Sequence, residues 1–166
     1  AKNKQLTFVY KKNINDNVFI KSDALKIKQI LSNILSNAIK YTINGKVHFI
    51  VSKDENSMTF NITDEGIGIP QDKLDEIFKP FSRIDNNESL IEGSGFGLFV
   101  VKGLIELLNG KINAIGIFIE VIFVQIVTNN LAEAVNGSVI GPGLIVAVAY
   151  GKFVCQKGLA CFVALG

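Results

Sequence analysis

Hydrophobic positions recur along the first two thirds of the chain with two different periods. Between residues 24 and 41 they recur mostly at steps of three and four, which predicts an amphipathic helix packed on a core. Ser22 and Asp23, just before this segment, are typical of a helix start. Short apolar runs bounded by turn residues predict strands at residues 6–10, 18–21, 46–53 and 58–63.

The rest of this region alternates between glycine-rich stretches and apolar segments. A loop is expected at residues 64–70, followed by a short helix near residues 72–77. A second glycine-rich stretch, residues 93–97, opens a helix that ends near Leu108, with Asn109-Gly110 as its cap. Two buried strands are expected at residues 111–115 and 118–127. The predicted fold class is α+β: a two-layer α/β sandwich with a mostly antiparallel sheet and helices on one face.

Composition changes abruptly near residue 129. The 166-residue chain has a formal net charge of +2, which gives no field that would indicate nucleic acid or an anionic membrane as a partner. From residue 129 onward only three residues are charged, namely Glu133, Lys152 and Lys157. We therefore expect a domain over residues 1–128 and an apolar, glycine-rich tail over residues 129–166. Three readings of the tail stay open: a hairpin packed on the domain, an unrelated fused segment, or a sequence artefact.

No targeting signal is visible in the sequence. No apolar run reaches the roughly 18–20 residues that a membrane-spanning helix requires, and the polar N-terminus is not typical of a signal peptide. Cys155 and Cys161 alone indicate neither a disulfide framework nor a metal site. We expect a cytoplasmic domain without direct membrane contact, whose parent protein would carry any membrane anchor outside this chain.

Three polar residues share one face of the predicted long helix. Asn33, Asn37 and Lys40 recur at helical spacing. Asparagine carbonyl oxygens are hard ligands suited to Mg²⁺, and a lysine ammonium can bind phosphate as a point charge. For the helix taken alone, a solvated polar face is the more common explanation.

Asp64 is the candidate for recognition of a nucleotide base. It follows a predicted strand and precedes Gly66 and Gly68, which let the backbone pass close to a ligand. A carboxylate here can accept a hydrogen bond from the amino group of adenine, whereas guanine has a carbonyl at that position. The alternative is an ordinary Asp-Gly turn.

The second glycine-rich stretch is the candidate for phosphate binding. Gly93, Gly95 and Gly97 lie where a loop enters a helix, and backbone amides at a helix N-terminus attract phosphate. The polar segment before them, roughly Ser82 to Glu92, is expected to form a lid that changes shape around a nucleotide.

Four stretches, in this order, resemble the sequence boxes of sensor histidine kinases. NILSNAIKYT at residues 33–42 resembles the N box, and DEGIGIP at residues 64–70 resembles the G1 box. FKPF at residues 78–81 resembles the F box, and GSGFGL at residues 93–98 resembles the G2 box. The resemblance covers about two thirds of the chain. It implies the Bergerat ATP-binding fold of the GHKL superfamily, which includes gyrases, chaperones and mismatch-repair proteins.

The resemblance also implies ATP and Mg²⁺ as cofactors and gives roles to individual residues. Asn37 would bind Mg²⁺ with Asn33 assisting, Lys40 would contact a phosphate, and Tyr41 would flank the adenine. Arg83 matches a position that reaches the terminal phosphate, although a free surface arginine is nearly as common there. The implied catalytic residues are Asn33, Asn37, Lys40 and Arg83. The implied nucleotide-binding residues are Asn37, Lys40, Tyr41, Asp64, Gly66, Gly68, Gly93, Gly95, Gly97 and Leu98.

Kinase activity is the reaction that the resemblance favours. In the hydrolases of the superfamily, a glutamate one helical turn before the Mg²⁺-binding asparagine acts as general base. This chain has Asn33 there, and an amide cannot accept a proton at neutral pH. We expect γ-phosphate transfer to a histidine on a separate dimerisation domain, with a response regulator as the downstream partner. A non-catalytic nucleotide-binding regulatory module and a GHKL ATPase are the alternatives.

His48, the only histidine of the chain, lies within a predicted strand, and we do not expect it to be the phosphoacceptor. Ile67 and Ile69 could line the base pocket or fill the core, and the core is the expectation for both. Phe78 and Phe81 are also expected in the core. After Ile112 the sequence departs from the family, because the following turn is short and the final Leu-Pro is absent. The sheet should therefore close differently.

Overall fold

The main sheet of the protein has five strands. The computed structural model describes residues 5–14, 18–82, 94–116, 118–124, 127–128, 145–149, 152–156 and 160–164. The strand order is β1-β3-β4-β6-β5, with β1 at Gln5–Asn13, β3 at Asn44–Lys53, β4 at Ser57–Asp64, β5 at Gly110–Ile115 and β6 at Phe118–Val124. β1 runs parallel to β3, and the other neighbours are antiparallel. The predicted mostly antiparallel sheet is confirmed.

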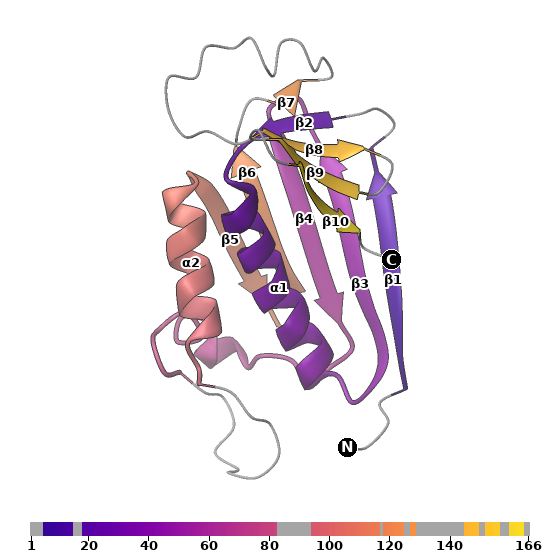
Figure 1. Ribbon diagram of the computed structural model, residues 1–166. Coiled ribbons are helices and arrows are strands. Elements are labelled where there is room, and N and C mark those ends of the chain that lie inside the picture. Colours follow the sequence, from indigo (N-terminus) through magenta and orange to yellow (C-terminus); the bar gives the residue numbers. More distant parts are fainter. Residues whose placement is uncertain are drawn as a thin grey trace.

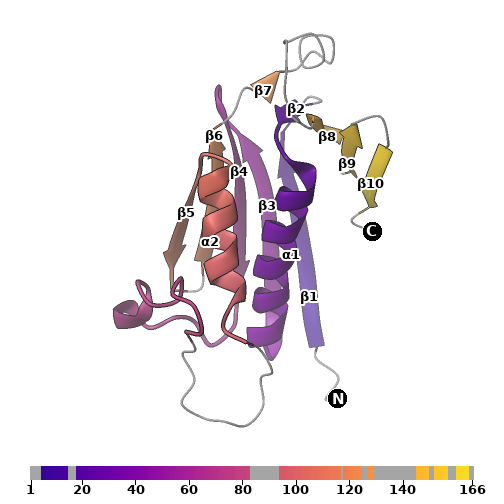
Figure 2. The same cartoon turned by 60° about the vertical axis from the view of Figure 1, so that its left-hand side comes forward.

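Two helices lie side by side on one face of this sheet, as Figures 1 and 2 show. They are α1, Ala24–Tyr41, and α2, Gly97–Leu107. The bounds of α1 agree with the predicted helix. The arrangement is the expected two-layer sandwich with helices on one face.

Local sequence explains where α1 begins and ends. The Asp23 carboxylate accepts a hydrogen bond from the backbone N–H of Lys26 at 3.0 Å, which satisfies one free amide of the first turn. At the other end Thr42 is extended, and its N–H donates to the Ala38 carbonyl at 3.1 Å. The apolar stripe between these ends is buried, and it consists of Ile27, Ile30, Leu31, Ile34 and Ala38.

The core lies between this stripe and the helix-facing side of the sheet. Alternate residues of the two central strands are buried there: Val47, Phe49, Val51, Met58, Phe60 and Ile62. The rings of Phe49 and Phe60 stack with their centroids 6.2 Å apart. The polar residues Asn33, Asn37 and Lys40 of α1 lie around the same cavity as Asp64, the last residue of β4.

Three predicted element boundaries need correction. The segment near residues 72–77 begins with a 3-10 turn, Gln71–Lys73, and continues as hydrogen-bonded turns in which the N–H groups of Glu76 and Ile77 donate to the Lys73 carbonyl, so it is not a regular helix. At the end of α2 the left-handed residue is Asn109, with a φ of 53°, so Gly110 already begins β5. β6 ends at Val124, before the predicted residue 127.

A second sheet combines strands from both sides of residue 129. Its order is β10-β9-β8-β2-β7, with β2 at Val18–Lys21, β7 at Val127–Thr128, β8 at Ile145–Ala149, β9 at Lys152–Gln156 and β10 at Ala160–Ala164. β8 pairs antiparallel with β2, directly before α1 (Figure 1).

Among the residues that the structure describes, no helix is long and apolar enough to cross a membrane.

Candidate functional site

A cavity of about 270 Å³ opens between α1, the end of β4, the loop that follows β4 and the start of α2. It brings together residues that are far apart in the sequence. Nine of the predicted site residues line it: Asn33, Asn37, Lys40, Tyr41, Asp64, Gly68, Gly95, Gly97 and Leu98. The N, G1 and G2 stretches therefore meet at one place.

The polar face of α1 forms one wall of the cavity. Asn33, Asn37 and Lys40 are each half-buried and line it. The side-chain oxygen of Asn33 lies 3.7 Å from the point where a Cβ on Gly97 would stand, so this wall reaches the start of α2. The Lys40 ammonium lies 5.1 Å from the centroid of the Tyr41 ring. One amide pair and one cation thus face the same space.

The start of α2 forms a second wall. Among the described residues no side chain caps its first turn, and the first N–H groups of a helix have no partner within the helix. Gly95 precedes this turn with a φ of +68°, and a Cβ there would stand 2.7 Å from the Ser82 carbonyl oxygen. Only glycine fits this position without displacing the backbone. A helix end of this kind suits an anionic phosphate group.

Asp64, the last residue of β4, lies at the other end of the cavity. Its Oδ1 accepts a hydrogen bond from the Gly66 N–H at 2.9 Å and lies 3.5 Å from the Thr42 hydroxyl oxygen. Burial raises the pKa of this carboxyl above its ordinary value of 3.8, and the two hydrogen bonds oppose that rise only in part. The site therefore holds a partly desolvated acceptor.

The loop after Asp64 is anchored on both sides. The Glu65 N–H donates to the Lys46 carbonyl at 3.0 Å, and the Lys46 N–H donates to the Glu65 carboxylate at 3.0 Å. Further on, the Ile69 N–H donates to the Gly116 carbonyl at 3.2 Å. A Cβ on Gly66 would stand 2.5 Å from Asp64 Oδ1 and 2.7 Å from the Tyr41 carbonyl oxygen, so glycine is required there. These contacts fix the orientation of the Asp64 carboxylate before any ligand binds.

The ligand set of the cavity suits a Mg²⁺ ion that arrives with a phosphate ligand. Lys40 and Asp64 are the charged side chains in its described lining, and Asn33 and Asn37 supply amide oxygens. Among the described residues there is no group of three or more histidine, cysteine or acidic side chains that could hold a metal. Any divalent cation here would complete its shell with water and phosphate oxygens, as Mg²⁺ usually does.

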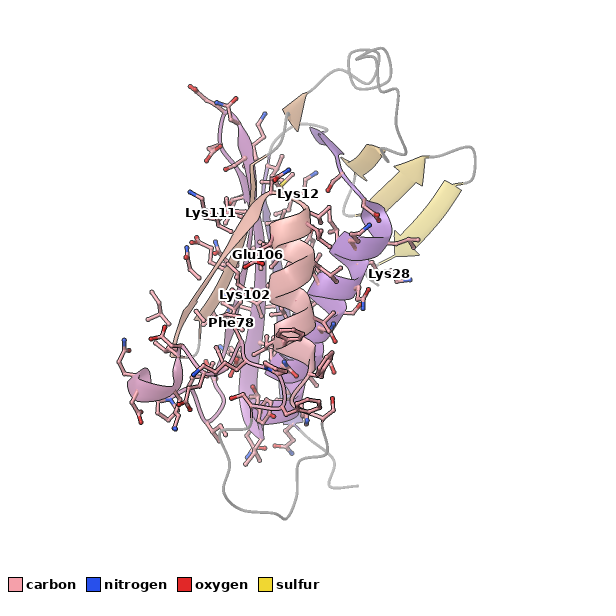
Figure 3. The ribbon with its side chains drawn as sticks, turned by 90° about the vertical axis from the view of Figure 1, so that its left-hand side faces the viewer. Lys12, Lys28, Phe78, Lys102, Glu106 and Lys111 are labelled. Atoms are coloured by element: carbon pink, nitrogen blue, oxygen red, sulfur yellow. The ribbon has the colours of Figure 1, made fainter. Side chains whose placement is uncertain are left out.

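The predicted core positions of four apolar residues are wrong in part. Ile67 and Ile69 line the cavity, and Ile67 is 55% exposed. Phe81 is 73% exposed and packs its ring against Phe96, with centroids 5.4 Å apart. Phe78 is half-buried, and the Lys102 ammonium lies 5.8 Å from its ring centroid (Figure 3). Strand alternation could not place these residues because they follow β4 in loops and turns.

Some predicted site residues lie outside the described part of the chain. These are Arg83 and Gly93, together with the expected lid apart from Ser82. Gly66 is described, and it contacts Asp64 without lining the cavity itself.

Several lining residues had not been predicted from the sequence. They are Ile34, Ala38, Ile62, Ile77, Ser82, Ser94, Gly116 and Ile119. Ile62 and Ile119 are paired on neighbouring strands, so the predicted sheet could have shown that they share a face. Gly116 reaches the cavity because the turn between β5 and β6 is short, and that shortness was visible in the sequence.

Comparison with known proteins agrees with this geometry. Residues 22–132 match the family model described as histidine kinase-, DNA gyrase B- and HSP90-like ATPase. The chain belongs to this ATPase family. Membership of this family implies that the domain binds a nucleotide. In the part of the chain that the structure describes, the cavity has walls that suit a base and phosphates.

Curated relatives of this ATPase domain are sensor kinases. The autoinducer 2 sensor kinase/phosphatase LuxQ of Vibrio parahaemolyticus is 36% identical over 119 residues, covering 68% of this chain and 14% of that protein. Hybrid signal transduction histidine kinase A of Dictyostelium discoideum is 41% identical over 100 residues, covering 53% of this chain and 5% of that protein. The chain thus corresponds to a small part of each relative.

Solved structures place the fold among histidine kinase catalytic domains. The catalytic domain of histidine kinase ThkA matches with a TM-score of 0.60 and 25% identity, over 72% of this chain and 79% of that one. Full-length ShkA in complex with AMPPNP matches with a TM-score of 0.58 and 25% identity, over 82% of this chain and 29% of that one. The chain thus combines the sequence of this ATPase family with the fold of histidine kinase catalytic domains.

The raised pKa of Asp64 predicts how Asp64→Asn changes stability with pH. A group whose pKa is raised by folding contributes stability below its unfolded value, here 3.8, and loses it as pH rises through the folded value. The wild type should therefore lose stability relative to the variant as pH rises from below 3.8 towards neutrality. We expect the melting temperature of Asp64→Asn to exceed that of the wild type at pH 7, by a margin that shrinks on acidification.

Thermal unfolding of both proteins between pH 3 and pH 8 tests this. Asp75→Asn is the matched control, because Asp75 is exposed and outside the cavity. If the melting-temperature difference between Asp64→Asn and the wild type does not change with pH, ionisation of Asp64 does not cost the domain folding free energy.

Proposed function

We propose that this domain binds Mg·ATP and transfers the γ-phosphate to a histidine on a separate dimerisation domain. The observation that carries the proposal is the order of the candidate binding groups along α1. A base acceptor, Asp64, lies at the Thr42 end of α1, and Asn33, near the middle of the helix, lies against the start of α2. Residues 33 and 41 are about 12 Å apart along a helix axis, a span that suits an extended nucleotide.

In this proposal the base binds at the β4 end. The Asp64 carboxylate accepts the adenine amino group, and Ile67 and Ile69 supply apolar surface beside the ring. Gly66 and Gly68 let the backbone approach the base, and Tyr41 flanks it. The same carboxylate faces a carbonyl in guanine, so the pocket favours ATP.

The phosphates bind at the other end. Backbone amides at Gly95, Gly97 and Leu98 donate to phosphate oxygens, and Lys40 adds a positive charge. Asn37, assisted by Asn33, would hold Mg²⁺, and the ion would supply positive charge to the phosphates. Arg83 and Gly93 remain predicted phosphate ligands.

Two features favour transfer to another protein over hydrolysis. Asn33 stands one turn before Asn37, and its amide cannot take a proton from water. His48 lies on β3 between the buried residues Val47 and Phe49, so alternation places it on the sheet face away from the cavity. The acceptor is therefore a histidine on another domain.

The wider setting follows from this role. We propose that residues 1–128 form the catalytic unit and that residues 129–166 are an apolar, glycine-rich tail outside it. A response regulator is the downstream partner, and the domain works in the cytoplasm. Neither nucleic acid nor direct membrane contact has a part in its activity.

Nucleotide preference tests the base assignment. The wild-type domain should bind Mg·ATP more tightly than Mg·GTP, and Asp64→Asn should weaken ATP binding about tenfold or more, because a charged hydrogen-bond acceptor is lost. Isothermal calorimetry with both nucleotides measures this. Asp75→Asn should bind ATP as the wild type does. Equal wild-type affinity for ATP and GTP would remove the basis of the assignment.

Asn37→Ala tests the metal assignment. With a histidine-bearing dimerisation domain supplied, the variant should transfer phosphate at least about a hundredfold more slowly, because a ligand of the charge-stabilising metal is lost. Radiolabel transfer measured beside thermal unfolding checks this, with Asn56→Ala, in the exposed β3–β4 turn, as the control. Unfolding of Asn37→Ala would mean that the residue is structural. Label on His48 without the added domain would overturn the choice of acceptor.

A further inference from the structure

Thr42 is a buried polar residue at the junction of α1 and the base-binding end of the cavity. Its exposed fraction is 0%, although it ends a surface helix. The backbone N–H donates to the Ala38 carbonyl at 3.1 Å, and the hydroxyl donates to the same carbonyl at 2.7 Å. The hydroxyl oxygen also lies 3.5 Å from Asp64 Oδ1. One side chain thus contacts both the end of α1 and the carboxylate.

The Thr42 hydroxyl can donate its hydrogen bond to either neighbour, and the Ala38 carbonyl keeps a donor in both cases. A hydroxyl has one proton and can rotate about its bond. If the proton turns towards Asp64, the Ala38 carbonyl keeps the hydrogen bond from the Thr42 N–H. Nothing in this exchange leaves a buried backbone group without a partner.

A second contact joins the same two segments. A Cβ on Gly66 would stand 2.7 Å from the Tyr41 carbonyl oxygen, so the loop backbone packs directly on the last turn of α1. Gly66 also donates its N–H to Asp64 Oδ1 at 2.9 Å. Asp64 Oδ1 therefore accepts from a backbone N–H on the loop and lies 3.5 Å from a hydroxyl on the helix end.

We propose that Thr42 is a positioning residue for base recognition, whose buried hydroxyl orients the Asp64 carboxylate against the end of α1. The inference rests on the proposed function in one respect, namely that Asp64 receives the adenine amino group. It adds that recognition of the base depends on α1, the helix that also carries Asn37 and Lys40.

The pKa of Asp64 depends on the groups around it, including Thr42. Lys40 on α1 lines the same cavity, and the Glu65 carboxylate next along the chain accepts from Lys46 on β3. The neighbouring walls from the loop and β6 are apolar at Ile67, Ile69 and Ile119. Burial raises the Asp64 pKa, and the hydrogen bonds from Gly66 and Thr42 lower it. Loss of the hydroxyl should therefore raise this pKa further.

Thr42→Val removes the hydroxyl and keeps the shape of the side chain. Valine suits the extended backbone of Thr42, at φ −91° and ψ 122°, so the fold should be retained. We expect the dissociation constant for Mg·ATP to rise about 3- to 10-fold, while that for Mg·GTP stays unchanged. Because the ionised carboxylate is the stronger acceptor for the amino group, the loss of ATP affinity on acidification should begin at a higher pH than in the wild type.

Two controls accompany this variant in calorimetry with ATP and GTP on the full chain. Thr42→Ser keeps the hydroxyl and should restore both the ATP preference and the wild-type pH profile. Thr59→Val removes a hydroxyl from the middle of β4, outside the cavity, and should behave as the wild type.

The outcomes separate this inference from the proposed function. A wild type that does not prefer ATP contradicts the proposed function itself. A wild type that prefers ATP, with Thr42→Val showing the same preference and the same pH profile, overturns the role of Thr42 alone. Equal weakening of ATP and GTP together with a lower melting temperature also overturns it, because Thr42 would then only support the fold.

Discussion

The packing of α1 on the sheet is the interaction on which the site depends. Ile30 and Ile34 are fully buried beneath this helix, against a sheet whose central strands bury Phe49 and Phe60 completely. Because side chains on a helix keep a fixed angular spacing, burial of this stripe fixes the rotation of α1 and thereby the directions of Asn33, Asn37 and Lys40. They must face the space between α1 and α2, beside the end of β4. The chemistry of the cavity therefore follows from the geometry of the core.

The base end of the cavity shows how stability and binding compete. Asp64 is held by Gly66 and near Thr42 in a partly desolvated position, and burial is the largest influence on its pKa. An ionised carboxylate here costs folding free energy in the free domain, and a ligand that donates a hydrogen bond to it offsets that cost. The backbone bonds of Lys46, Glu65 and Ile69 keep the loop in place, so little ordering remains for the ligand to bring about.

Features encoded by local sequence could be predicted, and features that depend on distant contacts could not. The bounds of α1, the strands of the main sheet and the convergence of Asn37, Asp64 and Gly97 followed from periodicity and from the resemblance to histidine kinases. The exposure of Ile67 and Phe81 did not, because each lies outside a strand or helix of the main fold.

Contacts between segments were also beyond the sequence. Thr42 meets Asp64, and Gly116 accepts a hydrogen bond from Ile69, only because helix and hairpin ends converge at the same end of the sheet. Neither pair shares a periodic pattern that would have indicated it. The roles of Arg83 and Gly93 still rest on the sequence resemblance alone.

A crystal structure of the domain with Mg²⁺ and a non-hydrolysable ATP analogue tests the central claim most directly. The account predicts that the adenine amino group lies within hydrogen-bonding distance of the Asp64 carboxylate. It also predicts the phosphates at the start of α2, with the metal on Asn37. A nucleotide bound in the reverse direction, with its phosphates near Asp64, or bound on the sheet face that carries His48, would contradict it.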